Sequence, residues 1–177
     1  MIQRLVVNGC SYMKYYDEGG GTTDLANLLN LPTFKNLSCN GVCNNRIIRT
    51  TLRDIYSTNI PTLYIVGTSF VNRFEMTALQ ERTEDGKWAS FNGWASYKQV
   101  PYTFANHISI TDFNNFVKGY VSIMNGSDLC EDLMYRLLSL VDTAKSNNHR
   151  ILIFNTAEHS VDYYLDEPQF DPFQQRK

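Results

Sequence analysis

Short apolar runs alternate with amphipathic stretches along most of the chain, and each pattern predicts one kind of element. Runs rich in β-branched and other apolar residues predict strands over Arg4–Asn8, Phe34–Leu37, Thr62–Val66 and Ile151–Asn155. Apolar residues at helical spacing predict a helix over Thr22–Leu31 after a glycine loop, a second over Asn44–Tyr56, and a long third helix that runs to about Lys145. Strands that alternate with helices indicate an α/β fold, and we expect a three-layer sandwich around a mostly parallel sheet. A site in such a sheet lies at the carboxyl ends of the strands.

Two of these elements have well-defined boundaries. The strand Thr62–Val66 is bounded by Pro61 and Gly67, and its apolar character is typical of a parallel strand that is covered on both faces. The long helix is predicted to begin at a capping box formed by Asp128 and Glu131.

The alternation breaks between Met76 and about Asp112. Aromatic residues crowd this stretch with little helical period: Trp88, Phe91, Trp94, Tyr97 and Tyr102. A turn signal at 84–86 lies before them, so we predict an aromatic-rich insertion over about 76–112 that contains a hairpin. The chain of 177 residues shows no linker or repeat, and we expect one domain over residues 1–177.

The charge balance argues against one class of partner. Lys and Arg total 16 and Asp and Glu total 18, which gives a net charge of -2 and no basic surface for a phosphate backbone. We therefore expect no nucleic-acid partner. The first apolar run, Met1 to Val7, contains polar residues and is too short for a signal peptide or a membrane span. We expect a cytoplasmic protein with no membrane partner.

The four cysteines, Cys10, Cys39, Cys43 and Cys130, are expected to be reduced thiols, because the chain shows no secretory signal. Cys39 and Cys43 have a spacing that suits two zinc ligands, but no second pair of Cys or His follows at finger-like spacing. We therefore expect no metal and no cofactor. Because Cys10 and the 39/43 pair follow neighbouring strands, a redox or metal protein remains a minor alternative.

Two strand ends carry residues suited to acyl transfer. Gly9-Cys10-Ser11 follows the first strand, and the segment 36–41, which ends in Gly41, follows the second. A serine on a tight turn can attack a carbonyl carbon, and nearby backbone N–H groups can stabilise the oxyanion. These segments resemble the first two blocks of the SGNH/GDSL hydrolases, in forms associated with phage and marine microbial genomes. The resemblance implies a flavodoxin-like sandwich in which Ser11 is the nucleophile and Gly41 donates to the oxyanion.

The third block departs from the family pattern. Ser69 stands after the third strand, where the family has the asparagine of a G-x-N-D motif. Asn72 lies three residues further on, and its amide reaches the same place if the loop turns back; the alternative is that Asn72 caps a helical turn. Arg73 and Glu75 are expected to pair with each other, either at the surface or in a way that fixes this loop.

The fourth block of the family is D-x-x-H after the last strand. Three aspartates lie in this part of the chain, and none has a histidine three residues on: Asp162, Asp166 and Asp171. His107 falls in the insertion, and His149 precedes the last strand, where we expect it to complement a helix dipole at the wrong edge of the sheet. His159 follows the last strand and is the best candidate for the general base. The alternatives are that His159 is a surface residue, or that the chain stops before the fourth block begins.

The resemblance implies a serine esterase that acts on small O-acyl esters, such as O-acetyl carbohydrates. Its expected site residues are Ser11, Gly41, Asn72 and His159. The aromatic insertion would then line the cleft or, alternatively, form a small core under a long loop. The missing fourth block favours another alternative, a degenerate member of the fold that binds a ligand or has a structural role without catalysis.

Overall fold

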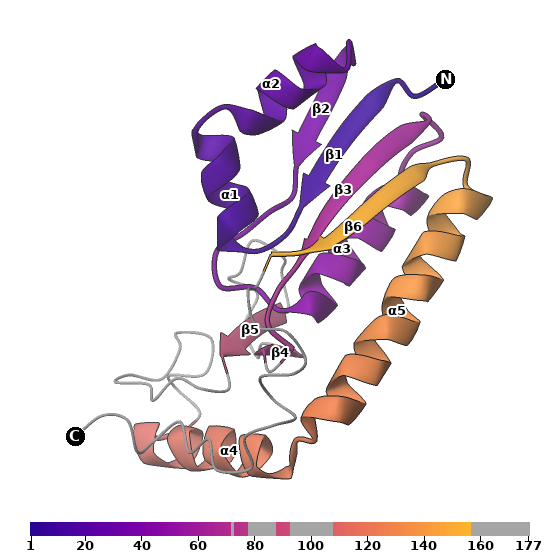
Figure 1. The fold of residues 1–177 in the computed structure, drawn as a ribbon. Helices are drawn as coiled ribbons and strands as arrows, with labels where there is room; N and C mark the ends of the chain where they lie inside the picture. The colour runs from indigo at the N-terminus through magenta and orange to yellow at the C-terminus, as the bar shows by residue number, and fades with distance from the viewer. Residues whose placement is uncertain (72, 78–87, 93–107, 157–177) are drawn as a thin grey trace.

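The computed structural model describes residues 1–71, 73–77, 88–92 and 108–156. In chain order the elements are β1 (Arg4–Asn8), α1 (Ser11–Glu18), α2 (Gly21–Leu28), β2 (Thr33–Asn36), α3 (Asn44–Tyr56), β3 (Thr62–Thr68), β4 (Arg73–Thr77), β5 (Trp88–Asn92), α4 (Ile110–Ile123), α5 (Gly126–Ser146) and β6 (Arg150–Asn155) (Figure 1).

Four strands form one parallel sheet in the order β2-β1-β3-β6. The register places Val7 of β1 opposite Asn36 of β2, and Asn8 of β1 opposite Val66 of β3. Because all the neighbouring pairs are parallel, the carboxyl ends of the four strands meet at one edge. The predicted α/β fold with a parallel sheet is therefore confirmed.

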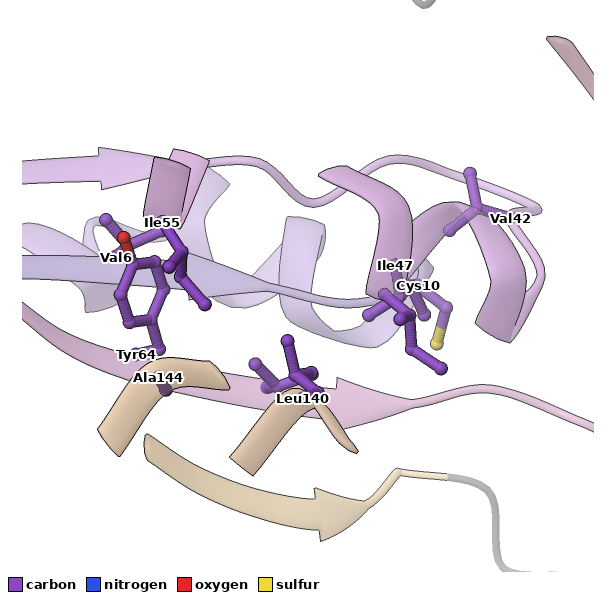
Figure 2. Close-up of a cluster of buried hydrophobic side chains, with 10 residues drawn as sticks. Val6, Cys10, Val42, Ile47, Ile55, Tyr64, Leu140 and Ala144 are labelled. Carbon is purple, nitrogen blue, oxygen red and sulfur yellow. The ribbon is translucent and has the colours of Figure 1, made fainter. Parts of the chain in front are cut away.

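Each face of the sheet has its own hydrophobic core, because alternate residues of a strand point to opposite faces. On one face, Leu5 and Val7 pack with Met13 of α1 and Ala26 of α2. On the other face, Val6 belongs to a cluster with residues of β3, α3 and α5. Figure 2 shows side chains from this second cluster, among them Val6, Tyr64, Ile55, Leu140 and Ala144. Helices α1 and α2 thus cover one face, and α3 and α5 cover the other (Figure 1).

The first helix was not predicted, because the sequence after β1 was interpreted as a loop. It begins at Ser11, with the N–H groups of Met13 and Lys14 both donating to the carbonyl of Cys10, at 3.0 and 3.1 Å. The predicted helix over Thr22–Leu31 is shorter in the structure and ends at Leu28. Asn30 has a φ of 52°, a left-handed conformation that a helix cannot continue through.

The predicted hairpin is present as the antiparallel pair β4 and β5, but it begins at Arg73, before the predicted start of the insertion at Met76. Helix α4 was not predicted, and it begins at Ile110, inside the stretch assigned to the insertion. Its residues Phe113 and Val117 are buried, one turn apart. Phe74 of β4 packs against Tyr120 of α4, with ring centroids 4.3 Å apart.

The long helix α5 begins before the predicted capping box. The side chain of Asn125 accepts a hydrogen bond of 3.0 Å from the N–H of Ser127, so Asn125 is the N-cap. Asp128 lies in the first turn instead of at the cap, where its charge still favours the helix dipole. The capping-box prediction located the helix correctly and its first residue wrongly.

A buried ionic network joins three strands to α3. Asp54 of α3 is 3% exposed and accepts hydrogen bonds from Arg4 of β1, Lys35 of β2 and Tyr64 of β3. Burial raises the pKa of Asp54, but the hydrogen bonds from its three partners lower it by more, and the net pKa lies below the ordinary value. The carboxylate therefore stays ionised and holds the central strands against α3.

Candidate functional site

The turn after β1 presents Ser11 at the carboxyl edge of the sheet. Ser11 is half-buried and is the first residue of α1, so its own N–H group has no partner within the helix. Asn8, the last residue of β1, holds the start of this turn. Its side-chain oxygen accepts a hydrogen bond of 2.9 Å from the N–H of Gly9. The amide of Asn8 also donates to the carbonyl of Ile47 in α3 at 3.0 Å. The position of Ser11 thus depends on β1 and α3 together.

Gly9 allows the close approach on which this turn depends. A Cβ atom at Gly9 would lie 3.0 Å from the carbonyl oxygen of Gly67 and would overlap the side chain of Met13. The glycine therefore lets the turn after β1 lie directly against the end of β3.

The loop after β2 docks on the same turn. The N–H of Cys39 donates to the carbonyl of Gly9 at 3.2 Å. Two residues further on, Gly41 is exposed and has a φ of 70°, a conformation that side chains other than glycine adopt at a cost. The structure therefore brings the loop that carries Gly41 to the turn that carries Ser11, as the sequence predicts.

Ser69, which follows β3, has its polar groups engaged within the protein. Asn44 clamps its backbone, with the side-chain oxygen accepting from Ser69 N–H at 2.7 Å and the side-chain nitrogen donating to Ser69 carbonyl at 2.8 Å. The Ser69 hydroxyl accepts from Nη1 of Arg73 at 3.0 Å, and Ser69 is only 3% exposed. Ser69 is therefore almost fully buried and is held in place by Asn44 and Arg73. Asn72 lies outside the described residues.

Arg73 and Glu75 do not pair with each other, contrary to the sequence prediction. Glu75 forms an ion pair with Arg49 of α3, through bonds of 2.5 and 3.4 Å. Arg73 instead donates to the carbonyl of Val42 at 3.3 Å and to Ser69. The guanidinium of Arg73 therefore links the loop after β2 to the loop after β3.

A polar contact that the sequence did not predict joins the end of β6 to the end of β3 at this edge of the sheet. Thr156, which follows β6, donates its hydroxyl to the carbonyl of Thr68 at the end of β3. The same hydroxyl lies 3.3 Å from the sulfur of Cys10. Cys10 is 1% exposed and belongs to the buried cluster (Figure 2), so this thiol is directed away from solvent. The only signal in the sequence was the position of Thr156 directly after a predicted strand.

His149 is the one histidine among the described residues, and it lies at the edge opposite Ser11. It is 4% exposed, and its Nδ1 accepts a hydrogen bond of 3.2 Å from the N–H of Thr62, the first residue of β3. Burial lowers the pKa of His149, which favours the neutral ring. The prediction that His149 lies at the wrong edge is confirmed, but as a neutral buried ring it does not complement a helix dipole as a cation would. His107 and His159 lie outside the described residues.

The described part of the chain holds no group of three His, Cys, Asp or Glu residues that could bind a metal ion together. Its four cysteines are free thiols. Within the described residues, no helix is both long enough and apolar enough to cross a membrane. Comparisons of the chain with protein-family models, curated proteins and solved structures gave no match in any of the three.

Proposed function

We propose that the protein is a serine acyl hydrolase of the SGNH type, with Ser11 as the nucleophile and the N–H group of Gly41 as an oxyanion donor. The observation that carries this proposal is the hydrogen bond from Cys39 N–H to Gly9 carbonyl, which holds the Gly41 loop against the Ser11 turn. The parallel sheet in the order β2-β1-β3-β6, with helices on both faces, supports a three-layer sandwich of the flavodoxin-like kind.

The reaction would proceed in two steps. The Ser11 hydroxyl oxygen bonds to the acyl carbon while a base takes its proton and passes it to the departing alcohol. Water then attacks the acyl-enzyme, and the bond to Ser11 breaks with release of the acid and recovery of the hydroxyl. In both steps the N–H groups of Ser11 and Gly41 would stabilise the negative oxygen. Asn72 is the proposed third donor, and His159 the proposed base.

We propose small O-acyl esters as substrates, with O-acetyl carbohydrates as one class. The insertion supplies many aromatic residues, and rings of this kind can stack on a sugar. Its hairpin begins at Arg73, which contacts the site at Ser69, so the insertion starts beside the carboxyl edge of the sheet.

A second candidate function is ligand binding without catalysis. It is favoured by one observation: among the described residues, no histidine lies at the edge that carries Ser11, since His149 lies at the opposite edge. In that case the Ser11 turn and the Gly41 loop would form a binding site for a carbonyl or an anion.

Hydrolysis of 4-nitrophenyl acetate by the wild type and by Ser11→Ala separates the two candidates. For a hydrolase we expect kcat/KM to fall at least about 100-fold in Ser11→Ala, because the nucleophile is lost while oxyanion stabilisation remains. Ser139→Ala is the matched control, because Ser139 is an exposed residue of α5, and its rate should equal that of the wild type.

Labelling with a fluorophosphonate provides an independent measurement, because this reagent bonds only to an activated serine hydroxyl. Mass spectrometry should find one adduct, located on Ser11, in the wild type and none in Ser11→Ala. Equal ester hydrolysis by wild type and Ser11→Ala, together with no adduct at Ser11, would reject the hydrolase and leave the binding module.

A further inference from the structure

Helix α5 carries apolar residues on its buried side and also on its solvent side. It covers one face of the sheet together with α3 (Figure 1), and its residues Leu140 and Ala144 belong to the buried cluster on that face. On the solvent side, Met134, Tyr135 and Leu138 are 57%, 63% and 56% exposed. Large apolar side chains that gather on one exposed face mark a surface for another protein. The solvent side of α5 is therefore a candidate interaction surface.

These three residues belong to a stripe that runs along most of α5. Residues three or four apart lie on the same side of a helix, so the stripe continues from Leu138 to Glu131 in one direction and to Lys145 in the other. The stripe consists of six exposed residues: Glu131, Met134, Tyr135, Leu138, Asp142 and Lys145. The hydroxyl of Tyr135 donates to Oε1 of Glu131 at 3.1 Å, so these two side chains share this side of the helix. The stripe thus has an apolar centre, an acidic end at Glu131 and a basic end at Lys145.

The charges at the two ends of the stripe are complementary to those of a second, antiparallel copy. Glu131 and Lys145 each lie seven residues from Leu138, which is about two helical turns. If two α5 helices pack antiparallel with their Leu138 side chains opposite each other, Glu131 of each helix lies level with Lys145 of the other. The same ion pair then forms twice, as a two-fold symmetric interface requires. A parallel pair would place like charges opposite each other at both ends, and this is unfavourable.

A groove beside the stripe can receive a large side chain of the second copy. The groove has a volume of about 560 Å³ and is lined by Tyr56, at the C-terminal end of α3, and by residues of α5 that include Leu138 and Asp142. Tyr56 is 70% exposed. In the antiparallel arrangement, Tyr135 of the second copy lies level with Asp142 and therefore beside this groove. An aromatic ring that fills a groove at the centre of an interface is a typical anchor of protein–protein contacts.

We propose that the protein forms a symmetric dimer through this stripe, with α5 of the second copy antiparallel to α5 of the first. Leu138 lies at the two-fold axis, and an ion pair between Glu131 and Lys145 forms on each side of it. Tyr135 of each copy enters the groove of the other. This inference goes beyond the proposed function, because none of the proposed site residues lies on α5. Either can hold without the other.

Sedimentation equilibrium over a range of protein concentrations tests the dimer. We expect the mass of the wild type to rise with concentration from the 20.4 kDa of the monomer to twice this value. Leu138→Asp places two like charges at the axis and should raise the dissociation constant at least about 100-fold. Leu28→Asp is the matched control, because Leu28 is a leucine of α2 that is 78% exposed, and its dissociation constant should equal that of the wild type.

An exchange of charges tests the antiparallel arrangement. Glu131→Lys and Lys145→Glu each turn both ion pairs of the dimer into pairs of like charge, and each should raise the dissociation constant about tenfold. The double variant Glu131→Lys/Lys145→Glu restores opposite charges across the interface and should recover most of the wild-type affinity. A contact on another surface would show no such recovery.

Three results would overturn the proposal. A wild type that is monomeric at every concentration would exclude the dimer and leave the stripe to a partner of different sequence. A dimer that Leu138→Asp does not weaken would place the contact on another part of the molecule. A double charge variant that associates as weakly as the single ones would exclude the antiparallel arrangement. Circular dichroism and thermal unfolding verify that each variant is folded, which we expect because every substituted side chain is exposed.

Discussion

Two buried asparagines determine the geometry of the carboxyl edge. Asn8 is fully buried and joins the turn before Ser11 to α3, and Asn44 is 6% exposed and clamps the backbone of Ser69. A buried amide that loses one partner leaves an unsatisfied group, so each asparagine constrains the loop it contacts strongly. The loops that carry the proposed chemistry are therefore held from beneath by side chains that take no part in it.

The largest effect of a single substitution on stability is expected at Asp54. In Asp54→Ala the guanidinium of Arg4, whose side chain is 13% exposed, loses its carboxylate, whereas Lys35 is 51% exposed and can turn to water. We expect the free energy of unfolding to fall by about 3–5 kcal/mol, the usual effect of breaking a buried ion pair. Urea denaturation measures this change.

The control for Asp54→Ala is Asp132→Ala. Asp132 pairs with Arg136 on the exposed surface of α5, with side chains 55% and 49% exposed. Its loss should cost less than about 0.5 kcal/mol, because solvent screens such pairs. Equal and small effects of the two substitutions would show that the buried network does not hold the sheet to α3.

The sequence located part of the candidate site, for a physical reason. Ser11 and Gly41 follow adjacent parallel strands, and the carboxyl ends of such strands must meet. The partners of Ser69 and Thr68 were not predictable in this way, because Asn44 and Thr156 reach them through side-chain geometry that no spacing encodes. The pairing of Glu75 with Arg49 was missed for the same reason. A sequence shows which charged residues are neighbours along one strand, such as Arg73 and Glu75. It does not show which charged residue of another element lies close to them.

At the scale of single elements, the N-cap of α5 offers a direct test. Asn125→Ala removes the acceptor for the N–H of Ser127, and we expect the free energy of unfolding to fall by about 1 kcal/mol. Ser127→Ala retains that N–H and should change the stability by less than about 0.5 kcal/mol. If Asp128 were the cap, as the sequence predicted, Asn125→Ala would have no effect, and Asp128→Ala would show the loss instead. Thermal or urea unfolding of the three variants distinguishes these outcomes.

The elements that the sequence predicted correctly are helices with apolar residues on one side and strands with a continuous apolar run. Helix α3 has the predicted bounds, because its buried and exposed residues alternate with helical period. Strand β3 was found from its apolar run, although it extends to Thr68. Helices α1 and α4 were missed because tyrosine, phenylalanine, asparagine and other weak helix formers fill them, and tertiary packing decides their conformation.

At the scale of the whole molecule, the parallel sheet separates two sets of polar residues. The carboxyl edge carries the proposed site around Ser11, whereas the charged network of Asp54 and the buried His149 lie toward the amino ends of the strands. These two groups titrate in acid, and both have a pKa below the ordinary value in the folded protein. Stability and activity are therefore expected to depend on pH through different residues.

The stability of the molecule should fall in acid in two stages. Burial lowers the pKa of His149 from its ordinary value of 6.5, so the unfolded chain binds a proton that the folded protein resists. This contribution is complete above about pH 6.5 and is lost as the pH falls toward the lower pKa of the folded state. Asp54 acts in the same direction at lower pH, below its ordinary value of 3.8. The melting temperature of the wild type should thus decrease as the pH falls from about 6.5 to about 5, before Asp54 titrates.

The variant His149→Asn isolates the first stage. The amide oxygen of Asn can accept from Thr62 N–H in place of Nδ1, and Asn does not titrate. Since His107 and His159 are present in both proteins, the difference between the two melting curves reports on His149 alone. We expect the melting temperature of His149→Asn to vary less over this range, so that the stability difference between the two proteins shifts in favour of the variant as the pH falls. Parallel curves would mean that His149 accepts a proton as readily in the folded protein as in the unfolded chain, and the acid sensitivity would then have to come from groups other than His149.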